Sequence, residues 1–569
     1  MESAGESRGA RSPEVSEHGL KENAIGFRDA LIIGIASTAP AYSLAAVIGL
    51  VVVTVGVQAP AVLLASFVPM FFVATAFYYM NRPDQDCGTT FSWVTRAMGP
   101  WAGWIGGWAI CVTGILVVGS LADVAARYTY LFFGLEGLAG SKVAITLFAV
   151  VIIVAMTAMC VIGTELSAHF QDILIIAQVG ALLLFAVVAL ARVFGGTAPE
   201  GSLVPELSWF SPFAIDSSSA LIAGLLIGVF IYWGWESSVN LTEETQNSES
   251  APGLAAVAST VVLLVTYLSV AAAVVAFGGV GTAEKFADDD AILSTLATGV
   301  LGSPWDKLVV LAVLTSALAS TQTTILPASR TVLSMARAGA MPAYLGETHP
   351  RYLTPHVSTI VVGALATIWY VPLNFLSENF LFDTLSALSL MIAFYYALTG
   401  FACAIYYRHE LLKSAKNFVF IGVAPVLGAL MLAYLFFRSM VDLANPGASY
   451  TGGSFLGLGL PLVIGLDFLL LGAILMVLWR LGGHMGFFGR TPETVDPEVA
   501  EGRVKVQETA GAGGGLNGKR GARLRRLPFG QGGSERGRES VQERHPGLDP
   551  AQAPAHLGGT RAVSSERSP

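Results

Sequence analysis

Long apolar segments, joined by short polar ones, make up the chain from residue 28 to residue 482. About twelve of these segments are long enough to cross a hydrocarbon core of about 30 Å as helices. Their short connections predict one compact bundle, an all-α integral membrane domain. Residues 1–27 and 483–569 are polar instead, so we expect a polar cytoplasmic lead and a disordered cytoplasmic tail.

Two of the segments, the first and the sixth, contain residues that suit a continuous membrane helix poorly. The first has the run GIASTAP at 34–40, and the sixth has the run FIYWGWE at 230–236. Backbone groups freed by a break inside the membrane are costly unless protein, water or a ligand satisfies them. Matching breaks in two halves are typical of transporters that bind a solute at the bilayer midplane. We therefore predict a 5+5 inverted repeat with two further helices appended.

The first break would provide two kinds of backbone end. If the helix unwinds between Ser37 and Pro40, its first half ends in free carbonyls and its second half begins with free N–H groups. Carbonyls suit a cation and N–H groups suit a carboxylate, so a zwitterion would fit without a charged side chain. Pro40 suits the first turn of a second half-helix, where its missing N–H costs nothing. Alternatively, Pro40 only kinks a packed helix.

The second break combines backbone freedom at Gly234 with an ionisable residue, Glu236. Aromatic residues flank both: Phe230, Tyr232, Trp233 and Trp235. Such rings either form the wall of a site or pack against lipid and core. A carboxylate inside a span usually faces an interior cavity. We interpret Glu236 as a proton-sensitive or helix-bracing group, or as an acceptor for freed backbone N–H groups.

Charge and composition limit the location and the class of protein. Loops on the N-terminal side hold more Lys and Arg than the opposite loops, which predicts that both termini are cytoplasmic. Charged residues make up only 13% of the chain, which excludes a soluble domain. The 8 histidines are scattered without metal-ligand spacing, which argues against a membrane enzyme. The sequence has no G-x-x-x-x-G-K-[ST] motif to support ATP-driven pumping.

Three short motifs, in order and at the right spans, resemble the amino acid–polyamine–organocation (APC) superfamily. Residues 240–248 (NLTEETQNS) are similar to its E-E-x-x-N-P stretch after the sixth helix. Residues 83–100, with PDQDCGT and RAMGP, resemble its loop after the second helix. Residues 328–342, with ASR and ARAGAMP, resemble its loop after the eighth. The likeness covers residues 28–480.

The resemblance implies a leucine-transporter-like fold and a secondary active transporter (permease) that moves amino acids by alternating access. The substrate would bind between broken helices 1 and 6. Thr38, Ala39 and Pro40 match the family's G-x-G site for the substrate carboxylate, although Pro40 has no N–H. Phe230 matches an aromatic residue that closes over substrate. The full candidate set is Ile35, Ala36, Ser37, Thr38, Ala39, Pro40, Phe230, Ile231, Tyr232, Trp233, Gly234 and Glu236.

The resemblance leaves the coupling ion open between sodium, protons and uncoupled exchange. Gln178 occupies the position where many proton-coupled relatives carry a Lys, and together with Glu236 it is a candidate coupling residue. The run AVLTS at 312–316 resembles a sodium-binding stretch of the leucine-transporter fold. A sodium site would then consist of Gly34, Ser37, Ala312, Thr315 and Ser316. Alternatively, Thr315 and Ser316 only bond their own helix.

We expect the partners to be a small amino acid or amine and the lipid bilayer, with no nucleic acid. Apart from a coupling sodium ion or proton, we expect no cofactor. The expected location is a bacterial plasma membrane. Two alternatives remain: a transporter or exchanger of polyamines or other organic amines, and a membrane sensor that binds its ligand without transport. The oligomeric state stays open.

Overall fold

The structure is a computed structural model that describes residues 19–279, 292–376, 380–496, 504–506 and 524–526. Within these ranges, 11 helical stretches are long and apolar enough to cross a membrane. The first stretch, Phe27–Asn81, has 55 residues and contains two crossings, because the chain turns back at Gly56–Gln58. The described residues therefore make the twelve crossings that the apolar pattern predicts.

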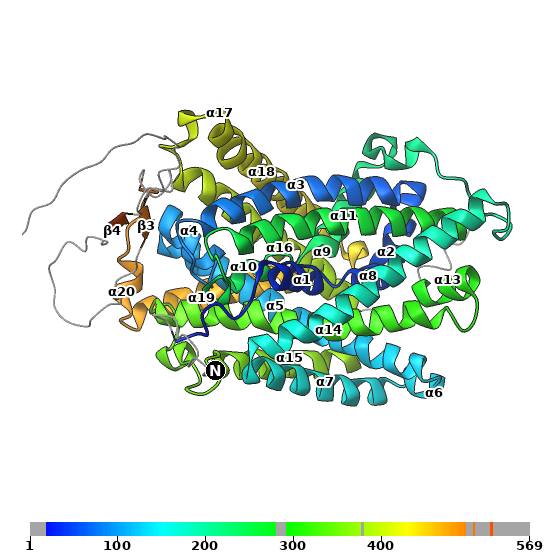
Figure 1. Cartoon of the computed structure of the whole chain (residues 1–569), viewed down its shortest axis with the longest axis horizontal. Coiled ribbons are helices and arrows are strands. Elements are labelled where there is room, and N and C mark those ends of the chain that lie inside the picture. The colour runs from blue at the N-terminus through cyan, green and yellow to red at the C-terminus, as the bar shows by residue number, and fades with distance from the viewer. Residues whose placement is uncertain (1–18, 280–291, 377–379, 497–503, 507–523, 527–569) are drawn as a thin grey trace, which may run out of the picture. The chain divides into compact units, whose positions relative to one another are not determined.

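The helices α1 to α8 form the first five crossings, and most of them are labelled in Figure 1. They are α1 (Phe27–Thr38), α2 (Pro40–Val55), α3 (Ala59–Asn81), α4 (Thr90–Met98), α5 (Pro100–Phe132), α6 (Glu136–Ala139), α7 (Lys142–Ile162) and α8 (Thr164–Phe194). The next five use α9 (Ser218–Tyr232), α10 (Ser237–Asn240), α11 (Ala251–Gly278), α13 (Ile292–Leu301), α14 (Lys307–Arg337), α15 (His356–Leu376) and α16 (Phe380–Tyr406).

The last two crossings are built from α17 (Ala415–Asn417), a π-helical turn at Phe418–Val423, α18 (Ala424–Leu443) and α19 (Leu460–Leu481), and α20 (Met485–Phe488) follows them. Two small antiparallel strand pairs are β1 (Ser454–Phe455) with β2 (Leu458–Gly459), and β3 (Val504–Val506) with β4 (Leu524–Arg526). Short 3-10 turns lie at Gly56–Gln58, Leu207–Phe210, Pro212–Ala214, Thr242–Glu244, Ala343–Gly346, Leu411–Lys413 and Pro446–Ala448.

The two halves follow the same order of elements, which supports the predicted repeat. Each begins with a broken helix, α1–α2 or α9–α10, and continues with one unbroken crossing. A short helix comes next, and then the longest helix of that half, α5 with 33 residues or α14 with 31. The short helices α4 and α13 lie at opposite ends of the bundle (Figure 1), as an inverted repeat requires.

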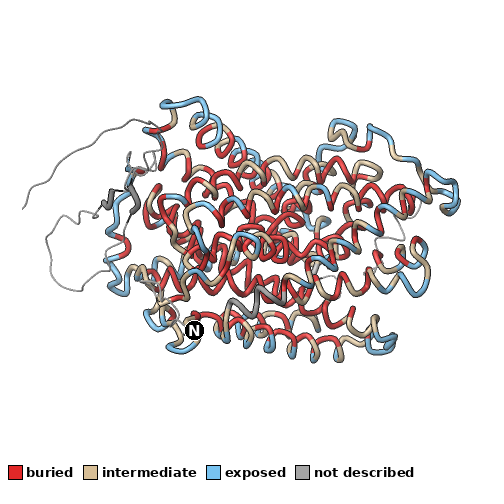
Figure 2. Tube along the Cα trace, viewed as in Figure 1, coloured by how far each residue is buried: buried red, intermediate tan, exposed pale blue. Residues whose placement is uncertain are grey.

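Burial separates central helices from peripheral ones. In their most apolar windows, α5 is 89% buried and α14 is 83% buried, and these two long helices pack against each other. The corresponding values for α7 and α19 are 39% and 28%. Figure 2 shows the buried residues gathered in the middle of the bundle. Apolar exposure on outer helices is what a bilayer would cover.

Both ends of the membrane domain extend further than the apolar pattern indicates. Near the N-terminus, Leu20 and Ile25 are fully buried. After α19, Phe487 stacks on Phe91, and the Glu493 amide donates to the Arg96 carbonyl at 2.6 Å. Ordered packing therefore continues past the expected boundary at 482. Most of the tail predicted to be disordered lies outside the described residues, and that part stays a prediction.

Candidate functional site

The first break occurs at a single residue between α1 and α2. Ala39 has φ 50° and ψ 60°, a left-handed conformation that is uncommon for a residue with a Cβ. Its amide donates to the Ala36 carbonyl, and Pro40 opens α2 at the first helical position. Because Pro40 has no N–H, it cannot continue the ladder of α1. The predicted interruption is confirmed.

Side-chain hydroxyls satisfy most of the backbone groups that this break frees. Ser320 Oγ donates to the Ser37 carbonyl at 3.0 Å, and Ser43 Oγ donates to the Thr38 carbonyl at 2.8 Å. The Tyr42 amide donates to Ser316 Oγ at 3.2 Å.

The second break is wider and lies against the first. α9 ends at Tyr232, Trp233 is extended, and Gly234 has φ +119°, which strongly favours glycine. A Cβ on Gly234 would lie 2.7 Å from the carbonyl carbon and oxygen of Ser37. Ser37 Oγ and Ser237 Oγ share a hydrogen bond of 2.6 Å. The second predicted interruption is confirmed, and the two breaks touch.

Glu236 holds the second break in place through hydrogen bonds. Its side chain is 4% exposed and accepts hydrogen bonds from the Gly234 amide at 3.1 Å and from Tyr395 Oη at 2.6 Å. Tyr396 Oη donates to Oε2, the oxygen that also accepts from the Gly234 amide, and Trp233 Nε1 donates to Tyr395 Oη. This carboxylate therefore ties the break to α16, as the bracing interpretation expects.

A small cavity lies where the two breaks meet. Its volume is about 10 Å³, room for about one water molecule. It is lined by Ser37, Thr38, Ala39, Tyr42, Ser43, Val117, Leu121, Phe230, Trp233 and Ser320. We call it the central cavity. In this conformation it is too small for an amino acid.

Five residues of the predicted candidate set line the central cavity: Ser37, Thr38, Ala39, Phe230 and Trp233. The others do not line it: Ile35, Ala36, Pro40, Ile231, Tyr232, Gly234 and Glu236. Sequence reasoning missed Tyr42, Ser43, Val117, Leu121 and Ser320. Tyr42 and Ser43 follow the break directly and could have been included, whereas Val117 and Leu121 look like any apolar residue of a membrane helix.

A second and larger cavity, of about 330 Å³, opens on the side of the bundle opposite the N-terminus. It is lined by residues of α2, α9, α16 and α18 and of the loop at 447–450. We call it the outer cavity. Phe230 lines both cavities and so separates them.

On α14 the two predicted sodium ligands make different contacts, because Ser316 Oγ accepts from the Tyr42 amide of the first break at 3.2 Å whereas Thr315 bonds its own helix. Thr315 Oγ1 donates to the carbonyls of its own helix, Leu311 at 2.8 Å and Ala312 at 3.1 Å. The α14 groups that contact Ser37 are Ser320 Oγ and, at 3.4 Å, the Thr323 carbonyl. These positions lie more than one turn beyond Thr315. The Gly34 carbonyl, another predicted ligand, accepts from Thr38 Oγ1 at 2.8 Å.

Gln178, the candidate coupling residue on α8, is fully buried. Neither of its amide atoms has a partner among the described residues. Two turns earlier on the same helix face, Gln171 Nε2 donates to the Ala319 carbonyl at 3.1 Å and to Gln322 Oε1 at 2.9 Å. α8 therefore carries two buried amide side chains, of which Gln171 is bonded to α14.

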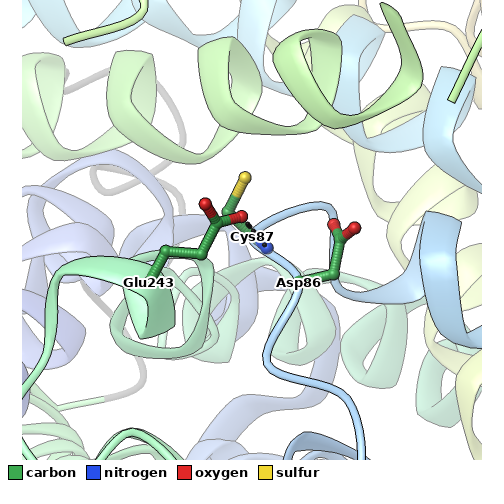
Figure 3. Close-up of side chains that lie close together, drawn as sticks. All are labelled: Asp86, Cys87 and Glu243. Atoms are coloured by element: carbon green, nitrogen blue, oxygen red, sulfur yellow. Dashed lines mark hydrogen bonds between the residues drawn. The ribbon is translucent and has the colours of Figure 1, made fainter. Parts of the chain in front are cut away.

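The three motifs that carried the family resemblance meet at the N-terminal side of the bundle. Arg330 Nη2 lies 2.6 Å from Glu244 Oε2, and both side chains are 1% exposed. Arg337 Nη1 lies 3.2 Å from Glu243 Oε2. The amide of Cys87 donates to Glu243 Oε1 at 3.1 Å (Figure 3). We call these contacts the inner network, and they join the loop after α3 and the turn after α10 to the end of α14.

Asp86, Cys87 and Glu243 lie close enough to share a metal ion (Figure 3). Their atoms are already engaged, because Asp86 Oδ1 accepts from Ser334 Oγ at 2.6 Å and Glu243 bonds as described. Burial and the neighbouring carboxylates also raise the pKa of the Cys87 thiol, and a metal needs the thiolate. The cluster fits a structural role better than a metal site.

Comparisons with known proteins agree with this geometry. MhsT, solved in complex with L-phenylalanine, matches with a TM-score of 0.54 at 13% identity, over 76% of this chain and 100% of that chain. This likeness concerns the fold alone, and it confirms the leucine-transporter-like architecture. The low-affinity putrescine importer PlaP of Escherichia coli (strain K12) is 22% identical over 65% of this chain and 78% of the importer.

Two proteins of Bacillus subtilis (strain 168) are also similar. Its methylthioribose transporter is 21% identical over 60% of this chain and 72% of that protein, and its branched-chain amino acid permease BcaP is 24% identical over 56% and 69%. The family model described as amino acid permease matches residues 25–465, nearly the whole membrane domain. The chain therefore belongs to the amino acid permease family of the APC superfamily and is a membrane transporter, not an enzyme.

Proposed function

We propose that this permease moves a neutral amino acid or a small organic amine across a bacterial plasma membrane by alternating access. The observation that carries the proposal is the contact of the two breaks, where Gly234 meets the backbone of Ser37 beside the central cavity. A solute held there touches backbone groups of both halves. It therefore responds to any movement of one half against the other.

Access from the two sides is governed by different groups. Phe230 alone is common to the central and outer cavities, so its movement would admit a solute from the outer side. On the N-terminal side, the Arg330–Glu244 pair and its neighbours must separate before a solute can leave. In this structure Phe230 lies between the two cavities and the Arg330–Glu244 pair is intact.

The lining of the central cavity favours a solute of low net charge. No charged side chain lines the cavity within the described residues. Glu236, the nearest candidate, is already bonded to three donors. The rings of Tyr42, Phe230 and Trp233 suit an apolar side chain or an ammonium group. Relatives named for branched-chain amino acids and for putrescine are consistent with both solute types.

Different residues would take part in coupling to sodium and in coupling to protons. Gln178 has no fixed charge, so it cannot replace a cation as a Lys would, and its free amide oxygen could face one. Glu236 is the carboxylate of the broken region and the candidate proton carrier. The excess of Lys and Arg in the loops on the N-terminal side supports the orientation in which both termini are cytoplasmic.

Uptake by purified protein in liposomes tests the proposal. Labelled leucine, phenylalanine and putrescine would be offered separately under a sodium gradient, a pH gradient and counter-substrate exchange. We expect uptake of at least one solute and a clear dependence on one of the three conditions. Binding of a solute without any uptake would instead favour the alternative of a membrane sensor.

A further inference from the structure

A side-chain hydrogen bond joins α2 to α5 beside the central cavity. Tyr42 Oη and Ser120 Oγ share this bond, and the two side chains are 1% and 4% exposed. Tyr42 lines the central cavity, and on α5 Ser120 stands in the same turn as the lining residues Val117 and Leu121. The bond therefore links two helices that form different walls of one cavity.

The course of α2 explains why this bond matters for access. Tyr42 and Ser43, one turn past the break at Ala39, line the central cavity, whereas Val47 and Leu50, further along the same helix, line the outer cavity. α2 therefore passes the boundary between the two cavities. Of these two cavities, α5 lines the central one. A displacement of α2 away from α5 would thus open the central cavity toward the outer one.

The two helices are held in place differently. α5 packs against α14, and its most apolar window is 89% buried. α2 begins directly after a break, with Pro40 at its first position, so it can tilt without bending α1. The first turn of α2 is bonded to the long helices through one residue, since the Tyr42 amide donates to Ser316 Oγ on α14 and the Tyr42 side chain is bonded to Ser120 on α5.

We propose that the Tyr42–Ser120 hydrogen bond is a latch that keeps the central cavity closed toward the outer cavity, with Ser120 as the positioning residue that holds Tyr42. The latch secures the α2 side of this boundary, whereas Phe230 covers the α9 side. The proposal rests on the proposed function, because it names a contact that a solute must break to enter from the outer side. A single hydrogen bond is strong enough to favour the closed form and weak enough to break in every cycle.

Thiol labelling of the purified full-length protein tests the latch without any solute. The chain's own cysteines are buried, so Val117→Cys, a change of similar volume, adds one reporter to the wall of the central cavity. A charged methanethiosulfonate reagent can reach position 117 only when the cavity opens, because the closed cavity has room for about one water molecule. In this background we expect Ser120→Ala and Tyr42→Phe each to raise the labelling rate about two- to tenfold. The double variant should be labelled no faster than the faster single variant, since both changes remove the same bond.

Thr113→Val on α5 is the matched control. Thr113 is fully buried and its Oγ1 donates to the Ala109 carbonyl of its own helix at 2.6 Å, so this variant loses a hydroxyl without affecting α2 and should leave the labelling rate unchanged. Cys87 of the inner network reports any general loosening, and mass spectrometry should find it unlabelled in every variant.

Three results would each overturn the latch: unchanged labelling at position 117 in both single variants, a double variant accelerated by the product of the two single effects, or a parallel rise in labelling at Cys87. The labelling does not depend on transport, so it separates the latch from the proposed function. Labelling as expected, together with no uptake of any solute by the wild type, would support the latch and count against the proposed function alone.

Discussion

Replacing Gly234 by alanine tests whether the contact between the two breaks is required for transport. The new Cβ would lie 2.7 Å from the Ser37 carbonyl carbon and oxygen and 2.9 Å from the Thr38 nitrogen. All three are backbone atoms, which cannot rotate away as a flexible side chain does. The φ of +119° is also a conformation that side chains with a Cβ rarely adopt.

The size of the effect follows from these two costs. Strain at a glycine-only conformation is about 1–3 kcal/mol, and forced overpacking adds about 1–3 kcal/mol. Even the smaller sum exceeds the 1.4 kcal/mol that corresponds to tenfold. If the breaks relax by moving apart, the solute loses contacts with one of the two halves. We therefore expect initial uptake rates in proteoliposomes to fall by at least tenfold.

The matched control is Gly180→Ala on α8, a helical glycine beside which a Cβ meets nothing within 4 Å. Its uptake rate and thermal unfolding in detergent should equal those of wild type. Normal uptake by Gly234→Ala at equal protein density would refute the reasoning, since the contact would then be dispensable. A rate loss of the same size in Gly180→Ala would show that any added methyl group in the bundle disturbs transport.

Three further predictions concern Glu236, the inner network and the expected ion site. Glu236→Gln replaces one acceptor oxygen by a donor, so we expect the free energy of unfolding to fall by about 1–3 kcal/mol. We also expect proton-driven uptake to be lost. An unchanged melting temperature would contradict the bracing role. Arg330→Ala leaves Glu244 buried without its partner, so the free energy of unfolding should fall by about 3–5 kcal/mol, measured by thermal unfolding. Adding Glu244→Ala should restore part of that stability. A double variant no more stable than Arg330→Ala would argue against the pair. Ser320→Ala removes the hydroxyl that contacts the first break and should reduce uptake a few-fold, whereas Thr315→Ala should not; the reverse order would favour the ion ligands expected from the sequence.

The breaks and the number of crossings were predictable because their signals are local. A proline preceded by small residues and a glycine beside a carboxylate mark weak points in an apolar segment, whatever surrounds them. Apolar length alone defines a crossing. The contact between Gly234 and Ser37 was not predictable, because it depends on how two helices that are far apart in sequence pack against each other.

The position of the contacting hydroxyls on α14 shows this limit clearly. The stretch 315–324 contains several Ser and Thr residues, so more than one register along the helix offers a hydroxyl to the first break. Sequence similarity favoured Thr315 and Ser316; packing brings Ser316 to the Tyr42 amide and Ser320 to the Ser37 carbonyl, whereas Thr315 bonds its own helix. Val117 and Leu121 of the central cavity carry no chemical signal at all, because any apolar residue is common in a span.

The chain after the last crossing acts as a mechanical link. The Glu493 amide is bonded to the carbonyl of Arg96 at the end of α4, and the Val495 amide to the carbonyl of Tyr406 at the end of α16. Arg490 reaches the Ala338 carbonyl just beyond α14 at 3.2 Å. These three helix ends can therefore spread apart only if the segment detaches or travels with them. A pull on the polypeptide beyond residue 496 would be transmitted to the end of the bundle that holds the inner network.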